Sequence, residues 1–322
     1  MSKHDSNLLD FFDQCNFKKN NYNFLITGAN GSDKFNFVTE IIKAYFNDIN
    51  GLNLKEPLNH PDIKYVSLPI YNKLSKRIGV LPEVARVKFD YGFIDLLDSD
   101  KIGKEIVVDQ IRELTEFLNL SSHFNHKFVI LNTCDYLNKE ASAAILKTLE
   151  ETNCKSIFFL IVSELSKISD TIISRCQRFN YKKNVPRKDY SSFYDYYISS
   201  LPREIVCDEN ISLSDLSTIE DDLFSLSQKK TPALFFSEKW AQFDKLLIDY
   251  LLNLFSLLLK GKYLNNETRE VHKCLSQKVT IDDNRVISIL KILLQKKSEL
   301  LNLNVNKKLF FDDLLIVISN EL

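Results

Sequence analysis

Residues 24–35 read Phe24-Leu25-Ile26-Thr27-Gly28-Ala29-Asn30-Gly31-Ser32-Asp33-Lys34-Phe35, and the architecture of the chain follows from them. The first four form a short apolar run of the kind found in buried strands, and residues 28–34 form a turn. Beyond the turn, apolar residues recur at helical spacing, at Val38, Ile41, Ile42, Tyr45 and Phe46. This succession predicts a strand, a turn and an amphipathic helix.

The same alternation continues through the first half of the chain. Further strands are predicted at the apolar runs 65–68, 106–108, 128–131 and 157–162. Helices are predicted at 109–120 and 138–151, with Asp109 and Asn138 as their capping residues. Short, fully apolar strands that alternate with helices are typical of an α/β fold, a parallel sheet covered by helices on both faces.

The second half of the chain has a helical pattern. A polar linker is predicted at 182–186, and helices are predicted over 190–201, over 213–226 and from Ser237 onward. The last region carries two apolar stripes, formed by Trp240, Phe243, Leu247, Tyr250, Leu251 and Leu254 and by Val286, Ile289, Leu290, Ile292 and Leu293. Such stripes favour the core of a helix bundle, and stripes this wide also suggest a surface for partner chains.

The turn after the first strand resembles a phosphate-binding loop that has lost its chemistry. That loop needs G-x-x-x-x-G-K-[ST], because glycines let backbone N–H groups wrap the phosphates and the hydroxyl binds Mg²⁺. Gly28, Gly31 and Lys34 remain, but Asp33 stands at the second glycine position and Phe35 at the hydroxyl position. Phe35 cannot bind a metal, and the carboxylate of Asp33 repels a polyphosphate.

The strand that should supply carboxylates also lacks them. Hydrolysis needs an Asp for the metal and a Glu for water after the apolar run 128–131, where this chain has Asn132 and Thr133. These losses predict a nucleotide-hydrolase fold that does not hydrolyse ATP, with ATP binding not expected. Two readings of Lys34 stay open: a solvated lysine at a helix start, or a residual phosphate contact.

Composition limits the class of protein further. The 322 residues suffice for two or three domains, and 42 basic against 43 acidic residues leave a formal charge of −1, which excludes a polybasic coat for nucleic acid. Six scattered cysteines predict a reducing compartment and no structural zinc. Asp5, Asp10 and Asp13 interrupt the start, where a signal peptide needs an apolar run, and no membrane span is expected. A cytoplasmic location is therefore predicted.

Three sequence blocks carry a resemblance to a known family. They are Val108-Asp109-Gln110-Ile111-Arg112-Glu113-Leu114, then residues 138–151 from Asn138 to Glu151, then Ser174-Arg175-Cys176-Gln177. In their order and spacing the chain resembles the bacterial clamp-loader family of AAA+ proteins, and within it the delta-prime members of DNA polymerase III. Weaker similarities lie at 59–63 and 306–315, so the resemblance extends over nearly the whole chain.

The resemblance implies a three-part organisation. It places an AAA+ α/β base with a degenerate phosphate loop at 1–182, a small helical lid at 183–232 and an all-α collar for oligomerisation at 233–322. It implies a subunit that does not hydrolyse ATP itself and joins gamma/tau-type ATPases and a delta subunit in a heteropentamer. Through that complex it would act on the sliding clamp and on primed DNA.

The family's zinc module is missing from this chain. Its four cysteines would lie between the phosphate loop and residue 60, but the segment 46–59 contains none, so no zinc is expected there. His60 is then predicted to be a histidine in a surface turn.

Arg175 is the site residue that the resemblance implies. In the family this arginine, between Ser174 and Cys176, reaches the γ-phosphate of ATP bound by the neighbouring subunit and stabilises the transition state in trans. From the sequence pattern alone, an ordinary ion pair is the alternative. Cys176 is expected to be a buried thiol, and Ser163, at the sensor position, a structural residue.

Two other functions stay open. The chain could be a drifted gamma/tau-type ATPase that still binds nucleotide through Lys34. It could also be a DNA-repair adaptor on the same fold, contacting phosphates through Lys182, Lys183, Arg187 and Lys188.

Overall fold

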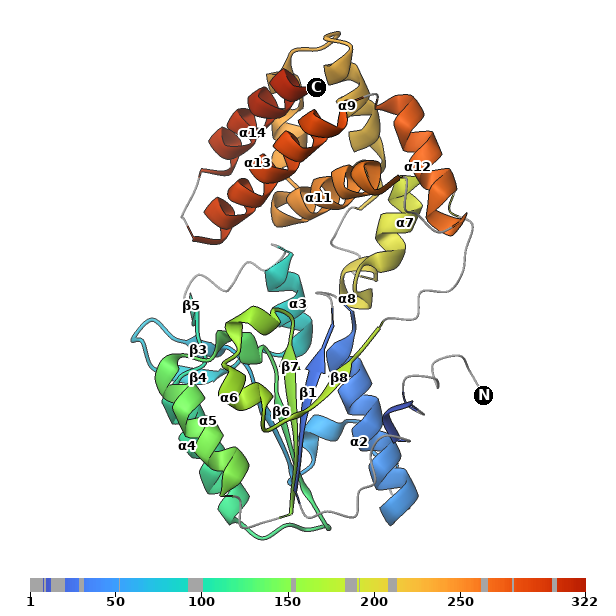
Figure 1. Ribbon diagram of the computed structural model, residues 1–322. Helices are drawn as coiled ribbons and strands as arrows, with labels where there is room; N and C mark the ends of the chain where they lie inside the picture. The colour runs from blue at the N-terminus through green and yellow to red at the C-terminus, as the bar shows by residue number, and fades with distance from the viewer. Residues whose placement is uncertain are drawn as a thin grey trace. The chain divides into compact units, whose positions relative to one another are not determined.

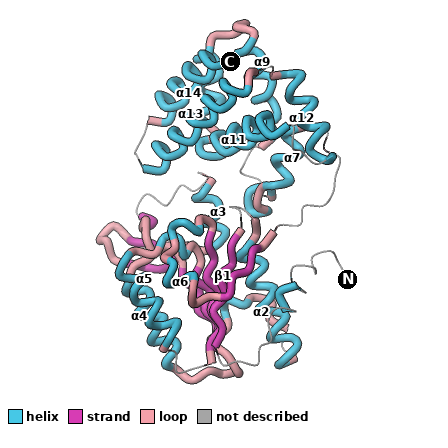
Figure 2. Tube along the Cα trace, in the orientation of Figure 1, coloured by secondary structure: helices cyan, strands magenta, loops and turns pink. Residues whose placement is uncertain are grey.

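The computed structural model describes residues 8, 10–12, 21–28, 32–51, 53–91, 101–151, 155–182, 190, 192–207, 213–261, 266–279, 281–302 and 306–322. The chain forms two compact units. The base unit comprises Met1–Arg86 and Asp95–Asn184, and the helical unit comprises Val87–Ile94 and Val185–Leu322. Figures 1 and 2 show a strand-rich base unit and an all-helical second unit, as the sequence predicts.

A five-stranded sheet forms the centre of the base unit (Figure 1). Its strands are parallel, in the order β2 (Ile63–Val66), β6 (Lys127–Leu131), β7 (Ser156–Val162), β1 (Asn21–Thr27) and β8 (Gln177–Asn180). Strands β6 and β7 are buried at every position, so both faces of the sheet are covered. This confirms the predicted parallel sheet.

The side-chain alternation of the strands divides the core between two helix layers. Phe24 and Ile26 of β1 pack in one cluster with Val38 and Ile41 of helix α2 (Lys34–Asn50). Leu25 points to the opposite face, because successive side chains of a strand alternate. Helices α4 (Val108–Asn119) and α5 (Lys139–Glu150) pack against each other and cover that face (Figure 1).

The shorter elements of the base unit differ most from the sequence predictions. A second, antiparallel sheet was not predicted; its order is β4 (Arg77–Val80), β3 (Pro69–Tyr71) and β5 (Lys101–Ile102). The strand predicted at 106–108 is wrong, because Ile106 forms only an isolated bridge with Leu137 and Val108 already begins α4. The base unit also contains helix α6 (Asp170–Ile173) and the 3₁₀ turns η1 (Pro57–Asn59), η2 (Cys134–Tyr136) and η3 (Leu165–Lys167). Helix α3 (Glu83–Asp90) begins in the base unit, and its residues from Val87 onward belong to the helical unit.

Of the two predicted helix caps, one is confirmed and one is wrong. The Asn138 side chain accepts a hydrogen bond of 2.8 Å from the backbone N–H of Ala141, at the start of α5. Asp109 lies inside the first turn of α4, not at its cap. There the side chain of Gln110 reaches back and accepts a hydrogen bond of 3.1 Å from the N–H of Val107.

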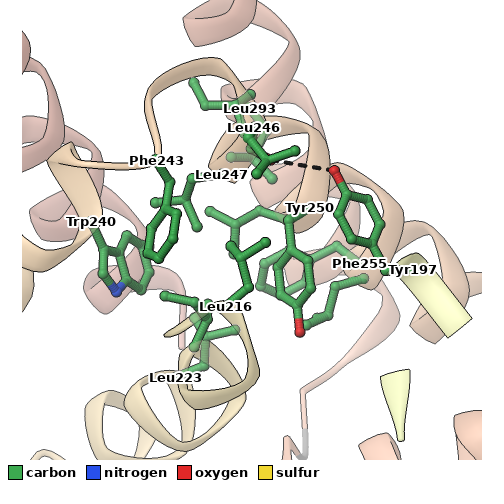
Figure 3. Packing of buried hydrophobic residues seen from close by; sticks show 14 of the residues in the cluster. Tyr197, Leu216, Leu223, Trp240, Phe243, Leu246, Leu247, Tyr250, Phe255 and Leu293 are labelled. Atoms are coloured by element: carbon green, nitrogen blue, oxygen red, sulfur yellow. Dashed lines mark hydrogen bonds between the residues drawn. The ribbon is translucent and has the colours of Figure 1, made fainter. Parts of the chain in front are cut away.

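The helical unit has its own core. Its elements are α7 (Phe193–Ser200), α8 (Arg203–Val206), η4 (Ser214–Thr218), α9 (Ile219–Ser227), η5 (Ala233–Phe236), α10 (Ser237–Ala241), α11 (Asp244–Lys260), α12 (Asn266–Lys278), α13 (Asp283–Asn302) and α14 (Lys307–Glu321). Figure 3 shows Trp240, Phe243 and Leu247 packed into this core together with Tyr197 and Tyr250. No helix in the described ranges is long and apolar enough to cross a membrane.

The core accounts for most of the two apolar stripes. The six stripe residues from Trp240 to Leu254 are buried within the unit, as are Val286, Ile289 and Leu293. The bundle-core reading is therefore confirmed, and these stripes do not need a partner to cover them. Residues assigned to the lid and to the collar share one hydrophobic cluster, and the boundary between 232 and 233 stays a prediction.

Replacing the confirmed cap should destabilise the protein more than replacing the acidic residue that does not act as one. We expect Asn138→Ala to lower the free energy of unfolding by about 1 kcal/mol, because a first-turn N–H of α5 loses its acceptor. Asp109→Ala removes an exposed ion pair with Arg112 and a first-turn charge that favours the helix dipole, and should cost less, about 0.5 kcal/mol. Urea denaturation of the two full-length variants measures the difference; equal losses would contradict the assignment.

Candidate functional site

Gly28 directly follows β1, at the carboxyl edge of the parallel sheet, where open α/β sheets usually bind their ligands. Gly28 is required there by a close approach: a Cβ at this position would lie 2.7 Å from the carbonyl oxygen of Tyr181. Asp33, just before α2, has a positive φ of 57°, in the left-handed region. Gly31 lies outside the described residues. The packing against Tyr181 explains Gly28 without any phosphate.

The side chain of Lys34 bends back toward Gly28. Its side chain is buried, with the residue only 6% exposed, and Nζ donates a hydrogen bond of 3.1 Å to the carbonyl oxygen of Gly28. Lys34 is therefore not the solvated lysine of the first reading. An ammonium has three N–H donors and this hydrogen bond uses one of them, so the residual phosphate contact of Lys34 stays a prediction.

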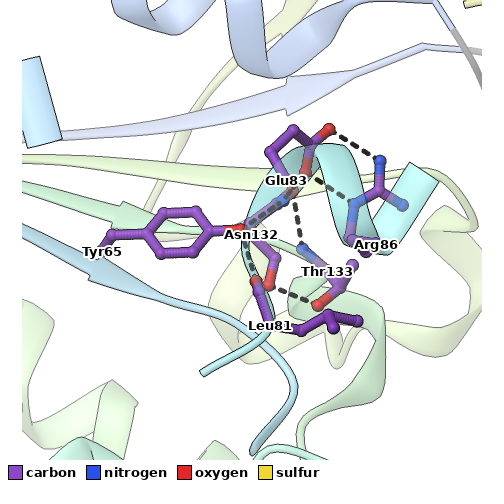
Figure 4. A network of polar contacts seen from close by, with 6 residues as sticks. All are labelled: Tyr65, Leu81, Glu83, Arg86, Asn132 and Thr133. Carbon is purple, nitrogen blue, oxygen red and sulfur yellow. Dashed lines mark hydrogen bonds and ion pairs between the residues drawn. The ribbon is translucent and has the colours of Figure 1, made fainter. Parts of the chain in front are cut away.

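A polar network occupies the end of β6, where the missing carboxylates would stand (Figure 4). The Asn132 amide donates to the phenol oxygen of Tyr65 at 3.2 Å and to the carboxylate of Glu83. The guanidinium of Arg86 holds the same carboxylate with two hydrogen bonds, of 2.7 and 2.8 Å. The side chains of Glu83 and Arg86 are only 12% and 15% exposed, so this pair is largely removed from water.

Tyr65 connects the network to the start of α2. Its hydroxyl donates to the carbonyl oxygen of Leu81 at 3.2 Å, and its ring packs edge-on against Phe35, with ring centroids 5.6 Å apart. Burial, followed by the negative charge of Glu83, raises the pKa of Tyr65 to about 12, so the phenol stays protonated at neutral pH. Phe35 thus fills with an aromatic ring the place where a metal-binding hydroxyl would stand.

The network satisfies its polar groups internally. A Mg²⁺ ion at this edge would compete with Arg86 for the only carboxylate in the network, that of Glu83. Separating the pair would leave a partly buried charge unpaired, which is costly. The sequence analysis missed Glu83 and Arg86, although their i, i+3 spacing at a helix start was a usable sign of an ion pair.

Arg175 lies on the rim of the base unit, between α6 and β8. Its Nε donates to the carboxylate of Glu150, and Nη1 donates to the carbonyl oxygen of Thr171 at 2.9 Å and to the Ser174 hydroxyl at 3.4 Å. The side chain is 39% exposed. The arginine is partly exposed at the rim, and residues of its own domain hold the guanidinium.

The side chains next to Arg175, those of Ser174 and Cys176, lie in surroundings that suit a structural role. Cys176 is only partly buried, and not the buried thiol that was predicted. Its partial burial still raises the pKa of the thiol to about 12, so the thiol is protonated at neutral pH and is a poor nucleophile. The hydroxyl of Ser174 donates to the carbonyl oxygen of Thr171 at 3.0 Å. Ser163 is partly buried and directly follows β7.

His60 is more enclosed than a surface-turn histidine. It lies at a bend, as predicted, but its ring packs between Phe46 and Phe124, with centroid distances of 4.8 and 5.3 Å. Its Nδ1 accepts a hydrogen bond of 3.1 Å from the backbone N–H of Asp62, and burial lowers its pKa. The ring therefore serves the packing of this corner.

Two further predictions fall partly outside the described ranges. Within those ranges no group of three or more His, Cys, Asp or Glu side chains could hold a metal ion; Cys15 and Cys154 lie outside them. Of the basic residues considered for DNA contacts, Lys182 is described and exposed, and Lys183, Arg187 and Lys188 lie outside.

Comparison with known proteins gives matches to DNA replication proteins. Residues 5–184 match the model of the family described as DNA polymerase III, delta subunit. The chain is 38% identical over 91 residues to the DNA polymerase III subunit gamma/tau of Mycoplasma pneumoniae, covering 28% of this chain and 13% of that protein. It is 35% identical over 88 residues to the delta′ subunit of Haemophilus influenzae, covering 27% and 26%. The matches thus span 13% and 26% of the length of these two curated relatives.

Among solved structures, the chain is similar to a gamma subunit-related protein of DNA polymerase III from Thermotoga maritima. The sequences are 18% identical, the TM-score is 0.47, and the match covers 97% of this chain and 99% of that one.

Restoring one carboxylate at the end of β6 should destabilise the base and should not create an ATPase. Asn132→Asp places a negative charge against Glu83, so we expect a loss on the order of 2 kcal/mol at pH 8, partly offset by Arg86. Repulsion raises the pKa of the introduced carboxyl in the folded state, so the deficit shrinks as the pH falls from 8 to 5. Urea denaturation at several pH values measures this.

The matched control is Asn180→Asp, at the exposed end of β8 on the same sheet. It should show little loss and little dependence on pH. Equal behaviour of the two variants, or ATP turnover by Asn132→Asp, would contradict the network's role.

Proposed function

Since the chain belongs to the DNA polymerase III delta subunit family, a bacterial clamp-loader family of AAA+ proteins, we propose that it is a non-hydrolysing, delta-prime-like clamp-loader subunit. In this role it helps the ATP-driven loading of the sliding clamp onto primed DNA during replication. It would do so through contacts with other subunits, without turning over ATP itself.

The observation that carries the proposal is the network around Glu83. The metal-binding and water-activating carboxylates of a hydrolase are replaced by Asn132 and Thr133, and the remaining carboxylate is held by Arg86. Because catalytic groups of this kind act as a unit, restoring one of the missing carboxylates alone would not restore hydrolysis.

Arg175 supplies the catalytic contribution in trans. It is always charged, stands at the rim of the base and is partly exposed, so it could reach an ATP molecule bound by a neighbouring subunit. A guanidinium placed against a γ-phosphate stabilises the charge of the phosphoryl-transfer transition state. Ser174 and Cys176 shape the turn around it.

The partners in this proposal are gamma/tau-type ATPases and a delta subunit, in a heteropentamer. The helical unit offers them exposed apolar side chains outside its own core, including Leu294 of α13 and Leu309 and Ile316 of α14, which are 59%, 65% and 46% exposed. Apolar groups on the collar surface are suited to contacts between subunits. These residues replace the buried stripes as the candidates for assembly.

One observation favours a second candidate function. The similarity to the gamma/tau subunit of Mycoplasma pneumoniae suggests an ATPase that has drifted and still binds nucleotide. The two functions differ in whether the isolated chain binds ATP.

The test of the proposal is Arg175→Ala in a clamp loader reconstituted with the other subunits of the same organism. At equal assembly, we expect a several-fold lower DNA-stimulated ATPase rate, well below the roughly 10³-fold effect of arginine fingers in GTPases, because one site of several is served. Arg175→Lys should rescue poorly, because an ammonium cannot make the bidentate contact.

Arg178→Ala is the control, since Arg178 is an exposed arginine on the adjacent strand β8. If the clamp loaders that carry Arg175→Ala and Arg175→Lys hydrolyse ATP at the wild-type rate, as the one with Arg178→Ala should, then Arg175 has no catalytic role in trans.

A further inference from the structure

We propose that Glu150 is a positioning residue for Arg175: its carboxylate holds the Nε edge of the guanidinium and leaves Nη2 to meet a phosphate of another molecule. This inference rests on the proposed function and assigns to that function a residue of α5. Glu150 touches neither nucleotide nor metal in this scheme, and it acts only through Arg175.

The contacts of the guanidinium are divided between its edges. Nε pairs with Glu150, and Nη1 donates to the carbonyl oxygen of Thr171 at 2.9 Å. Among the described residues Nη2 has no hydrogen-bond partner. A planar guanidinium that is held at Nε and Nη1 presents the N–H groups of Nη2 in a fixed direction, which suits a phosphate oxygen.

Helix electrostatics explains why Glu150 favours this pair. Glu150 is the last residue of α5, where the partial negative charge of the helix end disfavours a carboxylate. The positive charge of Arg175 offsets that repulsion. Among the described residues, the adjacent Glu151 forms an ion pair with Lys147 of α5, at 3.8 Å, and none with Arg175, so it is a suitable comparison.

A side chain of the central sheet also connects the backbones of the two segments that carry Glu150 and Arg175. The Asn23 side chain, on β1, donates to the carbonyl oxygens of Leu149 and Arg175 at 3.4 and 3.3 Å. The end of α5 and the turn after α6 are therefore tied to the same position of the central sheet. Because the backbones are fixed in this way, Glu150 and Arg175 give up less freedom to pair than two arbitrary surface side chains.

The ion pair of Glu150 and Arg175 contributes little to the stability of the fold, but it orients the guanidinium of Arg175. Both side chains are partly exposed, at 39% and 49%, and exposed ion pairs stabilise proteins weakly. Without Glu150, Arg175 samples other rotamers and reaches the phosphate in a smaller fraction of encounters. Loss of orientation lowers rate without loss of the charge itself.

The experiment is a double-mutant cycle in the reconstituted clamp loader at equal assembly. DNA-stimulated ATPase is measured for wild type, Glu150→Gln, Arg175→Ala and the double variant, with Glu151→Gln as control. We expect Glu150→Gln to lower the rate roughly two- to fivefold, by loss of orientation. In the Arg175→Ala background the same change should have no effect, because a positioning residue acts only through the group it positions. Glu151→Gln should leave the rate unchanged.

The outcomes separate the inference from the function on which it rests. If Arg175→Ala lowers the rate but Glu150→Gln leaves it unchanged, raises it, or lowers it equally in both backgrounds, the positioning role is overturned and the proposed function stands. If Arg175→Ala has no effect, both are overturned.

Discussion

The structure of the site depends on the contacts of one carboxylate, that of Glu83. The guanidinium of Arg86 and the amide of Asn132 both donate hydrogen bonds to it. The carboxylate places a negative charge at the end of β6. That charge is paired with Arg86, and the pair is largely buried. The phenol of Tyr65 joins the amide to the aromatic packing of Phe35. Opening the edge to a nucleotide and its metal would break these contacts together, because they share atoms.

Because of these contacts, two parts of the base unit have different roles. The carboxyl edge of the sheet is engaged in internal contacts, whereas the rim carries a charged group that remains partly exposed, at Arg175. The parallel sheet supports both places: β6 ends at the network, and β1 carries Asn23, which ties the turn of Arg175 to α5. A rigid base that presents an arginine fits a subunit that contributes by contact and not by turnover.

The long elements could be predicted from sequence, and the contacts that define the site could not. Continuous apolar runs revealed β1, β6 and β7 because strands covered on both faces lack polar positions. The strands β3 to β5 are two to four residues long and partly exposed, too short to show a period. The partner of Lys34 is a backbone carbonyl, which leaves no trace in side-chain patterns. Glu83 and Asn132 are 49 positions apart, so only the fold brings them together.

The most direct measurement is ATP binding by the isolated, full-length chain, by equilibrium dialysis with Mg²⁺ present. The internal network around Glu83 predicts no saturable binding at ATP concentrations up to about 1 mM, a bound that corresponds to roughly −4 kcal/mol. Binding of one ATP per chain with a micromolar dissociation constant would contradict a closed sheet edge and would favour the gamma/tau-type ATPase.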